Sequence, residues 1–146
     1  MTAPTVLFIC THNAGRSQLG AHLMDRVAQG RVRVLSGGVA PADRINPAIA
    51  TTLSELGIDT TDATPRAVTA DDLATADVVV TMKPNLDLPG PIRGEHVQWS
   101  FPDPAEWDAD GARGMRDAVK SAVEDLERRL RETARARTAA RSRRRS

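Results

Sequence analysis

The feature that constrains this chain most is a short apolar run followed by a loop that holds its only cysteine. Residues 6–9 read Val-Leu-Phe-Ile, and residues 10–17 read Cys-Thr-His-Asn-Ala-Gly-Arg-Ser. An apolar run without alternation is typical of a strand buried on both faces of a parallel sheet. After the loop, Leu19, Leu23 and Val27 recur at helical spacing. The order strand, loop and helix therefore indicates an α/β fold.

The rest of the chain continues this alternation of strands and helices. We expect a second strand that begins at residue 32 and ends at Ser-Gly-Gly, residues 36–38, and further strands at residues 78–80 and 95–99. Asn46 followed by Pro47 is typical of a helix start, and Thr69 with Asp72 resembles a capping box. A last helix is predicted to begin near Gly111. These signals favour a doubly wound parallel sheet in a single domain, because 146 residues are too few to expect two domains.

Charge separates the last residues from the rest. Residues 135–146 carry six of the 20 basic residues and none of the 19 acidic ones. We expect a folded domain over residues 1–133 and a disordered, arginine-rich tail over residues 134–146. Such a tail is able to bind nucleic acid through counterion release, but it has no aromatic residues for base stacking. A solvated extension is the favoured interpretation.

The cysteine and histidine content limits the kind of site that the chain can hold. One cysteine excludes an intramolecular disulfide and a cysteine-rich metal site. His12, His22 and His96 lack the spacing of metal ligands, so we expect no metal. No apolar run approaches the roughly 20 residues that cross a bilayer. We expect a cytoplasmic, monomeric protein that does not bind membranes.

The loop from Cys10 to Ser17 has the residues of an oxyanion site that works by covalent catalysis. In parallel sheets, ligands collect at the carboxyl ends of the strands, and a helix N-terminus attracts anions and favours a thiolate. We expect Cys10 to be the nucleophile, Arg16 to bind the oxyanion as a bidentate donor, and Ser17 to donate a hydrogen bond to the thiolate. Backbone N–H groups are expected to bind the oxyanion at Thr11, His12, Asn13, Ala14, Gly15 and Arg16.

The loop also allows a prediction about its backbone conformation, and it has an alternative, non-catalytic interpretation. Asn13 and Gly15 suit a tight bend, because both residue types tolerate a left-handed backbone. The alternative to a catalytic loop is an inert cysteine buried at a strand end. The complete pattern of cysteine, five residues, arginine and serine between a strand and a helix favours the catalytic interpretation.

A phosphoryl-type transfer also needs a proton donor for the leaving group, and Asp103 is the candidate. It lies in Phe-Pro-Asp-Pro-Ala, where an aspartate before proline is equally typical of a simple turn. Asp108 and Asp110 are alternatives, but both are expected at the start of the last helix.

These residues resemble the low-molecular-weight protein tyrosine phosphatase superfamily, which includes a branch of arsenate reductases. The loop matches the family pattern Cys-X5-Arg-Ser, and Asp103 with Pro104 matches its late Asp-Pro pair. The resemblance covers residues 5 to about 133. It implies a three-layer α/β domain whose four-stranded parallel sheet has helices on both faces. It also implies that Cys10 is the nucleophile, Arg16 an oxyanion ligand and Asp103 the general acid.

Departures from the phosphatase pattern favour the reductase branch. Phosphatases of the family usually have Gly-Asn in the loop, proline after Arg-Ser, and an aromatic residue after Asp-Pro. This chain has His12-Asn13, Gln18 and Ala105 at those places, and it has no tyrosine. Thioredoxin-coupled reductases need two more cysteines after the third strand, where residues 81–85 here read Thr-Met-Lys-Pro-Asn.

The single cysteine resembles the mycothiol-coupled arsenate reductases instead. In those enzymes an arsenate–mycothiol adduct forms, and mycoredoxin reduces it to arsenite. The resemblance thus implies arsenate as substrate, mycothiol as cosubstrate, mycoredoxin as partner and no bound cofactor. Two alternatives stay open: a phosphatase that forms a phosphocysteine intermediate, and a protein that binds oxyanions without catalysis.

Overall fold

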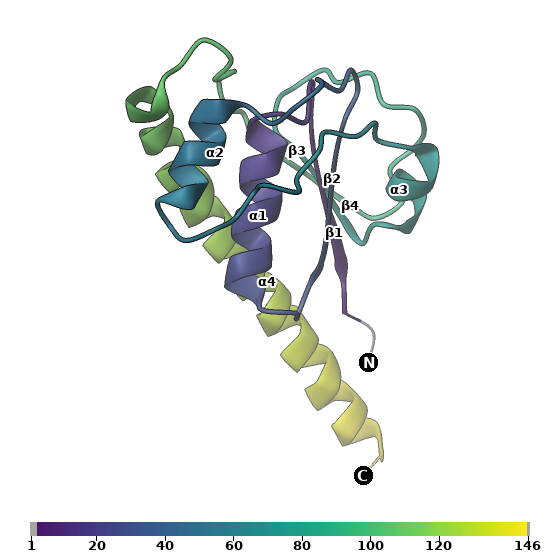
Figure 1. The fold of residues 1–146 in the computed structure, drawn as a ribbon. Coiled ribbons are helices and arrows are strands. Elements are labelled where there is room, and N and C mark those ends of the chain that lie inside the picture. Colours follow the sequence, from purple (N-terminus) through teal and green to yellow (C-terminus); the bar gives the residue numbers. More distant parts are fainter. Residues whose placement is uncertain (1–2, 146) are drawn as a thin grey trace.

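A parallel sheet of four strands organises the structure, a computed structural model that describes residues 3–145 (Figure 1). The strands are β1 (Thr5–Cys10), β2 (Arg33–Gly38), β3 (Val78–Thr81) and β4 (Glu95–Gln98). The helices are α1 (Arg16–Ala28), α2 (Pro47–Ser54), α3 (Ala70–Thr75) and α4 (Ala109–Arg145). The strand order is β2-β1-β3-β4, and every pair is parallel. The expected α/β class is confirmed.

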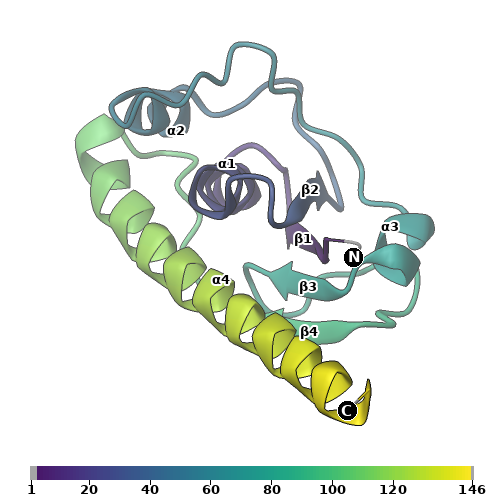
Figure 2. The ribbon, with the colours of Figure 1, turned by 90° about the horizontal axis from the view of Figure 1, so that it is seen from below.

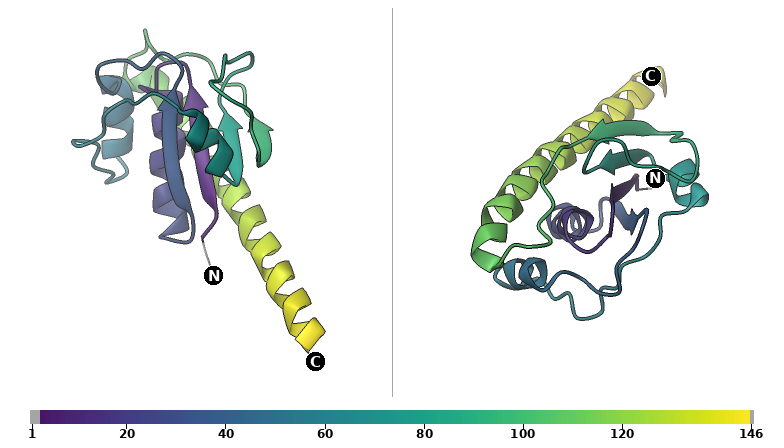
Figure 3. Two further views of the ribbon diagram at one scale, coloured as in Figure 1. Left: turned by 90° about the vertical axis from the view of Figure 1, so that its right-hand side faces the viewer. Right: turned by 90° about the horizontal axis from the view of Figure 1, so that it is seen from above.

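Helices cover both faces of the sheet, as Figures 2 and 3 show. Val6 and Phe8 of β1 pack into a core with α1, α2 and α4, whereas Leu7 and Ile9 face a smaller cluster that includes Leu73 of α3. The side chains of these four residues are fully buried. Burial of each stabilises the fold by about 1.5–3 kcal/mol. The uninterrupted apolar run follows from this position between two helical layers.

Helix α1 lies unusually close to β1 because Gly20 has no side chain. A Cβ built on Gly20 would lie 2.5 Å from Cδ1 of Phe8. This close packing fixes the start of α1 relative to the end of β1. The loop between them is therefore held from both sides.

The local signals for helix starts are confirmed. The Asn46 side chain caps α2 with Pro47 in the first turn, and Thr69 and Asp72 form a complete capping box on α3. Strand β2 reaches Gly38, within the segment at residues 36–38 where its end is predicted, and Gly38 pairs with Cys10 in parallel register. This pairing places the end of β2 directly beside the loop.

The C-terminal residues differ from the expectation of a disordered tail. Residues 134–145 continue α4 as a helix. Alanine and arginine are strong helix formers, no glycine or proline follows Gly114, and arginines near a helix C-terminus interact favourably with its dipole. The last part of α4 projects beyond the sheet (Figure 1). None of the helices in residues 3–145 is long and apolar enough to cross a membrane.

Candidate active site

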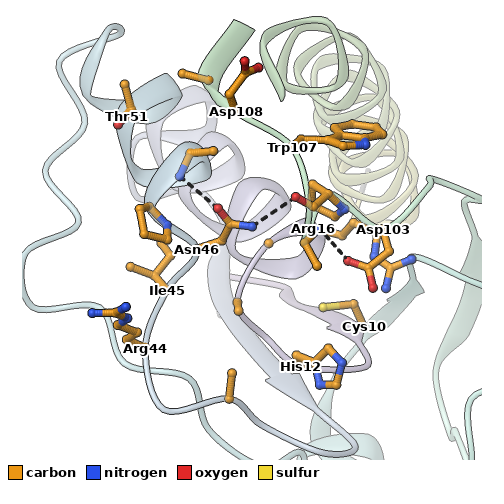
Figure 4. Close-up of a pocket in the computed structure, with 18 residues that line it drawn as sticks. Cys10, His12, Arg16, Arg44, Ile45, Asn46, Thr51, Asp103, Trp107 and Asp108 are labelled. Atoms are coloured by element: carbon orange, nitrogen blue, oxygen red, sulfur yellow. Dashed lines mark hydrogen bonds between the residues drawn. The ribbon is translucent and has the colours of Figure 1, made fainter. Parts of the chain in front are cut away.

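The loop after β1 opens into a pocket at the carboxyl end of the sheet, with a cavity volume of about 560 Å³. Figure 4 shows the side chains around it. Cys10, Arg16 and Asp103 all line this pocket, although Asp103 is 87 residues from Arg16 in the chain. Of the predicted oxyanion ligands, His12, Ala14, Gly15 and Arg16 line it as well. Thr11 and Asn13 do not line it, and neither does Ser17, the predicted hydrogen-bond donor to the thiolate.

The Cys10 thiol is buried and is held by a short chain of hydrogen bonds behind the loop. Its Sγ lies 3.0 Å from Oγ of Ser17, the residue that the sequence predicts as a hydrogen-bond donor to the thiolate. Nδ2 of Asn13 donates to the same Ser17 oxygen at 2.7 Å. A hydroxyl has only one hydrogen, and Ser17 has accepted from Asn13, so that hydrogen is free to point at the sulfur. In this arrangement the sulfur of Cys10 can accept a hydrogen bond from Ser17.

The two residues expected to bend the loop act for different reasons. Asn13 has a φ of 51°, the predicted left-handed conformation. Gly15 does not, because its φ is −129°. A Cβ on Gly15 would lie 2.8 Å from Cγ of Pro104, so glycine is needed for close contact with the segment that carries Asp103. The prediction for Gly15 was therefore wrong in its reason.

Arg16 is the first residue of α1, and only 6% of its surface is exposed. Its Nη1 donates to the carbonyl oxygen of Phe101 at 3.0 Å. That bond fixes the guanidinium against the segment between β4 and α4. The remaining N–H groups of a guanidinium form a planar set of donors that suits a tetrahedral oxyanion.

Asp103 is exposed, and its Oδ1 accepts a hydrogen bond from the N–H of Ala105 at 3.0 Å. The turn predicted for Asp-Pro is thus present, and it holds the carboxyl group at the pocket. The alternative acids, Asp108 and Asp110, have partners at the start of α4. Asp108 also lines the pocket, but its Oδ1 accepts from the N–H of Gly111 at the start of α4, and Asp110 pairs with Arg113.

Asn46 is a site residue that the sequence analysis identified only as a helix cap. Its Oδ1 accepts from the N–H of Ala48 at 2.9 Å, and its Nδ2 donates to the carbonyl oxygen of Pro104 at 3.2 Å. Its backbone N–H donates to the carbonyl oxygen of Ala14 at 2.8 Å. One residue thus joins the oxyanion loop, the start of α2 and the segment that carries Asp103. Figure 4 shows both side-chain bonds.

The histidines take part in local structure. Nδ1 of His12 bonds to the carbonyl oxygen of Ala40, and His96 bonds to Thr81 on the neighbouring strand. Within residues 3–145, no three His, Cys, Asp or Glu side chains are grouped as metal ligands.

Comparisons with known proteins agree with this geometry. The profile of the family described as "Low molecular weight phosphotyrosine protein phosphatase" matches residues 5–87. An arsenate reductase of Staphylococcus epidermidis is 32% identical over 134 residues, which are 88% of this chain and 100% of that protein.

Two solved structures are also similar. A thioredoxin-dependent arsenate reductase of Corynebacterium glutamicum has a TM-score of 0.78 and 30% identity, over 90% of this chain and 63% of that one. The present chain thus spans less than two thirds of the corynebacterial protein. An arsenate reductase of Archaeoglobus fulgidus has a TM-score of 0.71 and 27% identity, over 84% of this chain and 98% of that one.

Proposed function

The chain belongs to the low molecular weight phosphotyrosine protein phosphatase family, and we propose that within it the protein is an arsenate reductase that depends on an external thiol. The carrying observation is that Cys10, at the base of the oxyanion pocket, is the only cysteine of the sequence. The relatives named arsenate reductases support the choice of arsenate.

The geometry supports a reaction in three steps. Arsenate binds to the loop amides and Arg16, and the Cys10 thiolate attacks arsenic while Asp103 protonates the departing oxygen, which leaves as water. An external thiolate then attacks arsenic and displaces Cys10, which gives an arsenate–thiol adduct. A second external thiol attacks the sulfur of that adduct. The electron pair of the arsenic–sulfur bond stays on arsenic as arsenite, and the two external sulfurs form a disulfide.

We propose mycothiol as the first thiol and mycoredoxin as the second. The pocket volume of about 560 Å³ lies within the range of about 300–1,000 Å³ that is typical of small-molecule sites. A pocket of this size supports a small-molecule cosubstrate beside the oxyanion. No second thiol of this chain can resolve an intermediate on Cys10, so the reducing electrons come from other molecules.

The second candidate is a phosphatase that forms a phosphocysteine intermediate, and Trp107 is the observation that favours it. Trp107 lines the pocket and offers an indole ring against which an aryl group of a phosphate ester could stack. The same thiolate, arginine and acid would serve that reaction. Water would then hydrolyse the phosphocysteine.

One preparation tests both reactions. We expect arsenite release only when arsenate, mycothiol and mycoredoxin are present together, and a loss of this activity in Cys10→Ser. Asp103→Asn should slow turnover strongly, whereas Asp110→Asn should not, because Asp110 is outside the pocket. Efficient hydrolysis of an aryl phosphate without arsenite release would favour the phosphatase. Tight arsenate binding in calorimetry without turnover in either assay would favour a non-catalytic binder.

A further inference from the structure

We propose that Arg66 is a positioning residue for the Cys10 thiolate. Arg66 lies outside the oxyanion loop, between α2 and α3, and it does not line the pocket. Its backbone N–H donates to Oδ1 of Asn13 at 3.0 Å. The inference rests on one part of the proposed function, namely that Cys10 reacts as a thiolate. It applies equally to arsenate and to phosphate ester chemistry.

The argument rests on the direction of each hydrogen bond behind the loop. The oxygen and nitrogen of an asparagine side chain can exchange places, and only their partners decide which end faces where. A backbone N–H can only donate. The atom of Asn13 that faces Arg66 must therefore be the oxygen, and Nδ2 must face Ser17.

The same polarity passes on to the thiol. Because Nδ2 of Asn13 donates to Ser17 Oγ at 2.7 Å, the Ser17 hydrogen is left to point at Cys10 Sγ at 3.0 Å. If the Asn13 amide turned round, its oxygen would accept the Ser17 hydrogen and the thiolate would lose its donor. Nε2 of Gln18 donates to the main-chain carbonyl oxygen of Asn13 at 2.9 Å and lies 3.4 Å from Asn13 Oδ1, so it is a second and more distant donor to that oxygen beside the Arg66 N–H.

The Arg66 side chain holds this backbone N–H in place. Nη1 donates to the carbonyl oxygen of Ser36 at 2.5 Å, and Nη2 pairs with Oδ2 of Asp72 at 2.6 Å. Asp72 itself is nearly buried, and its carboxylate also accepts from the N–H of Thr69 in the capping box of α3. Burial works against the charged form, but hydrogen bonds from Thr69 and Arg66 keep the pKa of Asp72 below its ordinary value. The ion pair is thus tied to a helix terminus.

The main chain on the other side of Arg66 is fixed as well. Its carbonyl oxygen accepts from the N–H of Gly38 at 2.9 Å, so the segment pairs with the end of β2. Pro65 precedes Arg66 and restricts the backbone to few conformations. Without the guanidinium these main-chain contacts keep the donor present, but the side-chain bonds to Ser36 and Asp72 that also hold it are lost.

The test is the pH profile of Cys10 alkylation by iodoacetamide in Arg66→Met, a reaction that needs neither arsenate nor a phosphate ester. We expect alkylation near neutral pH to slow by about three- to tenfold, and the midpoint of the profile to move to higher pH, because a hydrogen bond to a charged group is lost from part of the population. The other titratable or charged groups that line the pocket with Cys10 stay in place: His12, Arg16, Arg44, Asp103 and Asp108.

Arg129→Met is the matched control. Arg129 has a similar exposure, 46% against 44%, and pairs with Glu95 at the opposite end of the sheet. We expect the control to leave the alkylation profile unchanged. Arg66→Lys should restore part of the rate, because it keeps the charge. If circular dichroism shows that Arg66→Met does not fold, Asp72→Asn is used as the test variant, and it should shift the alkylation profile in the same direction.

A double variant separates positioning from a general loss of structure. In a Ser17→Ala background, Arg66→Met should have no further effect, because the proposed influence reaches the sulfur through the Ser17 hydroxyl. The proposal is overturned if Arg66→Met leaves the profile unchanged, if Arg129→Met shifts it as much, or if Arg66→Met acts equally with and without Ser17. Failure of arsenite release alone would count against the proposed function, but it would not affect the conclusion about Arg66, because the alkylation assay needs no arsenate.

Discussion

Replacing Asn46 tests whether its bridge to Pro104 holds the general acid in position. Two variants separate the functions of this side chain. Asn46→Ser keeps an oxygen that can cap α2 but is too short to reach the carbonyl oxygen of Pro104. Asn46→Ala loses both the cap and the bridge. The backbone bond to Ala14 is available in both variants.

The expected magnitudes follow from these contacts. A hydrogen bond such as the one to Pro104 contributes about 1 kcal/mol net, so both variants should lower kcat by about fivefold if the bond favours the productive position of Asp103. The lost cap costs a further ~1 kcal/mol, which only Asn46→Ala should show. Its Tm should therefore lie about 2–4 °C below that of Asn46→Ser.

The assay is steady-state turnover with arsenate and, separately, with an aryl phosphate, beside thermal unfolding of each variant. Alkylation of Cys10 should not change, because Asn46 does not touch the hydrogen bonds behind the thiol. A kcat of Asn46→Ser equal to that of the parent protein, under conditions where Asp103→Asn is slow, would refute the idea that the bridge positions the acid.

Three further predictions concern stability. Glu127 is buried and its pKa is lowered, since bonds from two arginines outweigh the cost of burial; Glu127→Gln should lower the free energy of unfolding in urea by about 2 kcal/mol. Gly114 lies inside α4 with open space around it, so Gly114→Ala should raise that free energy by about 0.5–1 kcal/mol. The hydrogen bond from Arg113 contributes most to lowering the pKa of Glu55 from 4.5 to about 2. The stabilisation by the ionised Glu55 carboxylate should be complete above pH 4.5 and lost as the pH falls towards 2. Glu55→Gln should therefore make the free energy of unfolding less dependent on pH in that window.

Features set by neighbouring residues could be predicted from the sequence. The buried β1, the loop after it, the Asn46 cap and the capping box of Thr69 and Asp72 depend on residues a few positions apart. The pattern of the loop was sufficient to identify Cys10 and Arg16 as candidates. The structure brings both to one pocket with Asp103, while their catalytic roles stay predictions.

Features that depend on distant contacts could not be predicted. The bonds from Asn46 to Pro104 and from Arg66 to Asn13 span 58 and 53 residues. No local pattern distinguishes these two residues from an ordinary helix cap and an exposed arginine. Gly15 shows the same limit, because its need for glycine arises from contact with Pro104 and not from its own backbone angles. Helix α4 extends further than expected because alanine and arginine favour a helix even where the charges are all of one sign.

The position of the chain ends has a practical consequence. The pocket opens at the carboxyl ends of the strands. Strand β1 begins, and α4 ends, at the opposite side of the molecule (Figure 1). A surface linker, a fluorophore or an affinity handle joined near either end would leave the entrance clear. The protein can therefore be immobilised on an electrode or a resin through α4, with its pocket facing the solution, for direct measurement of oxyanion binding.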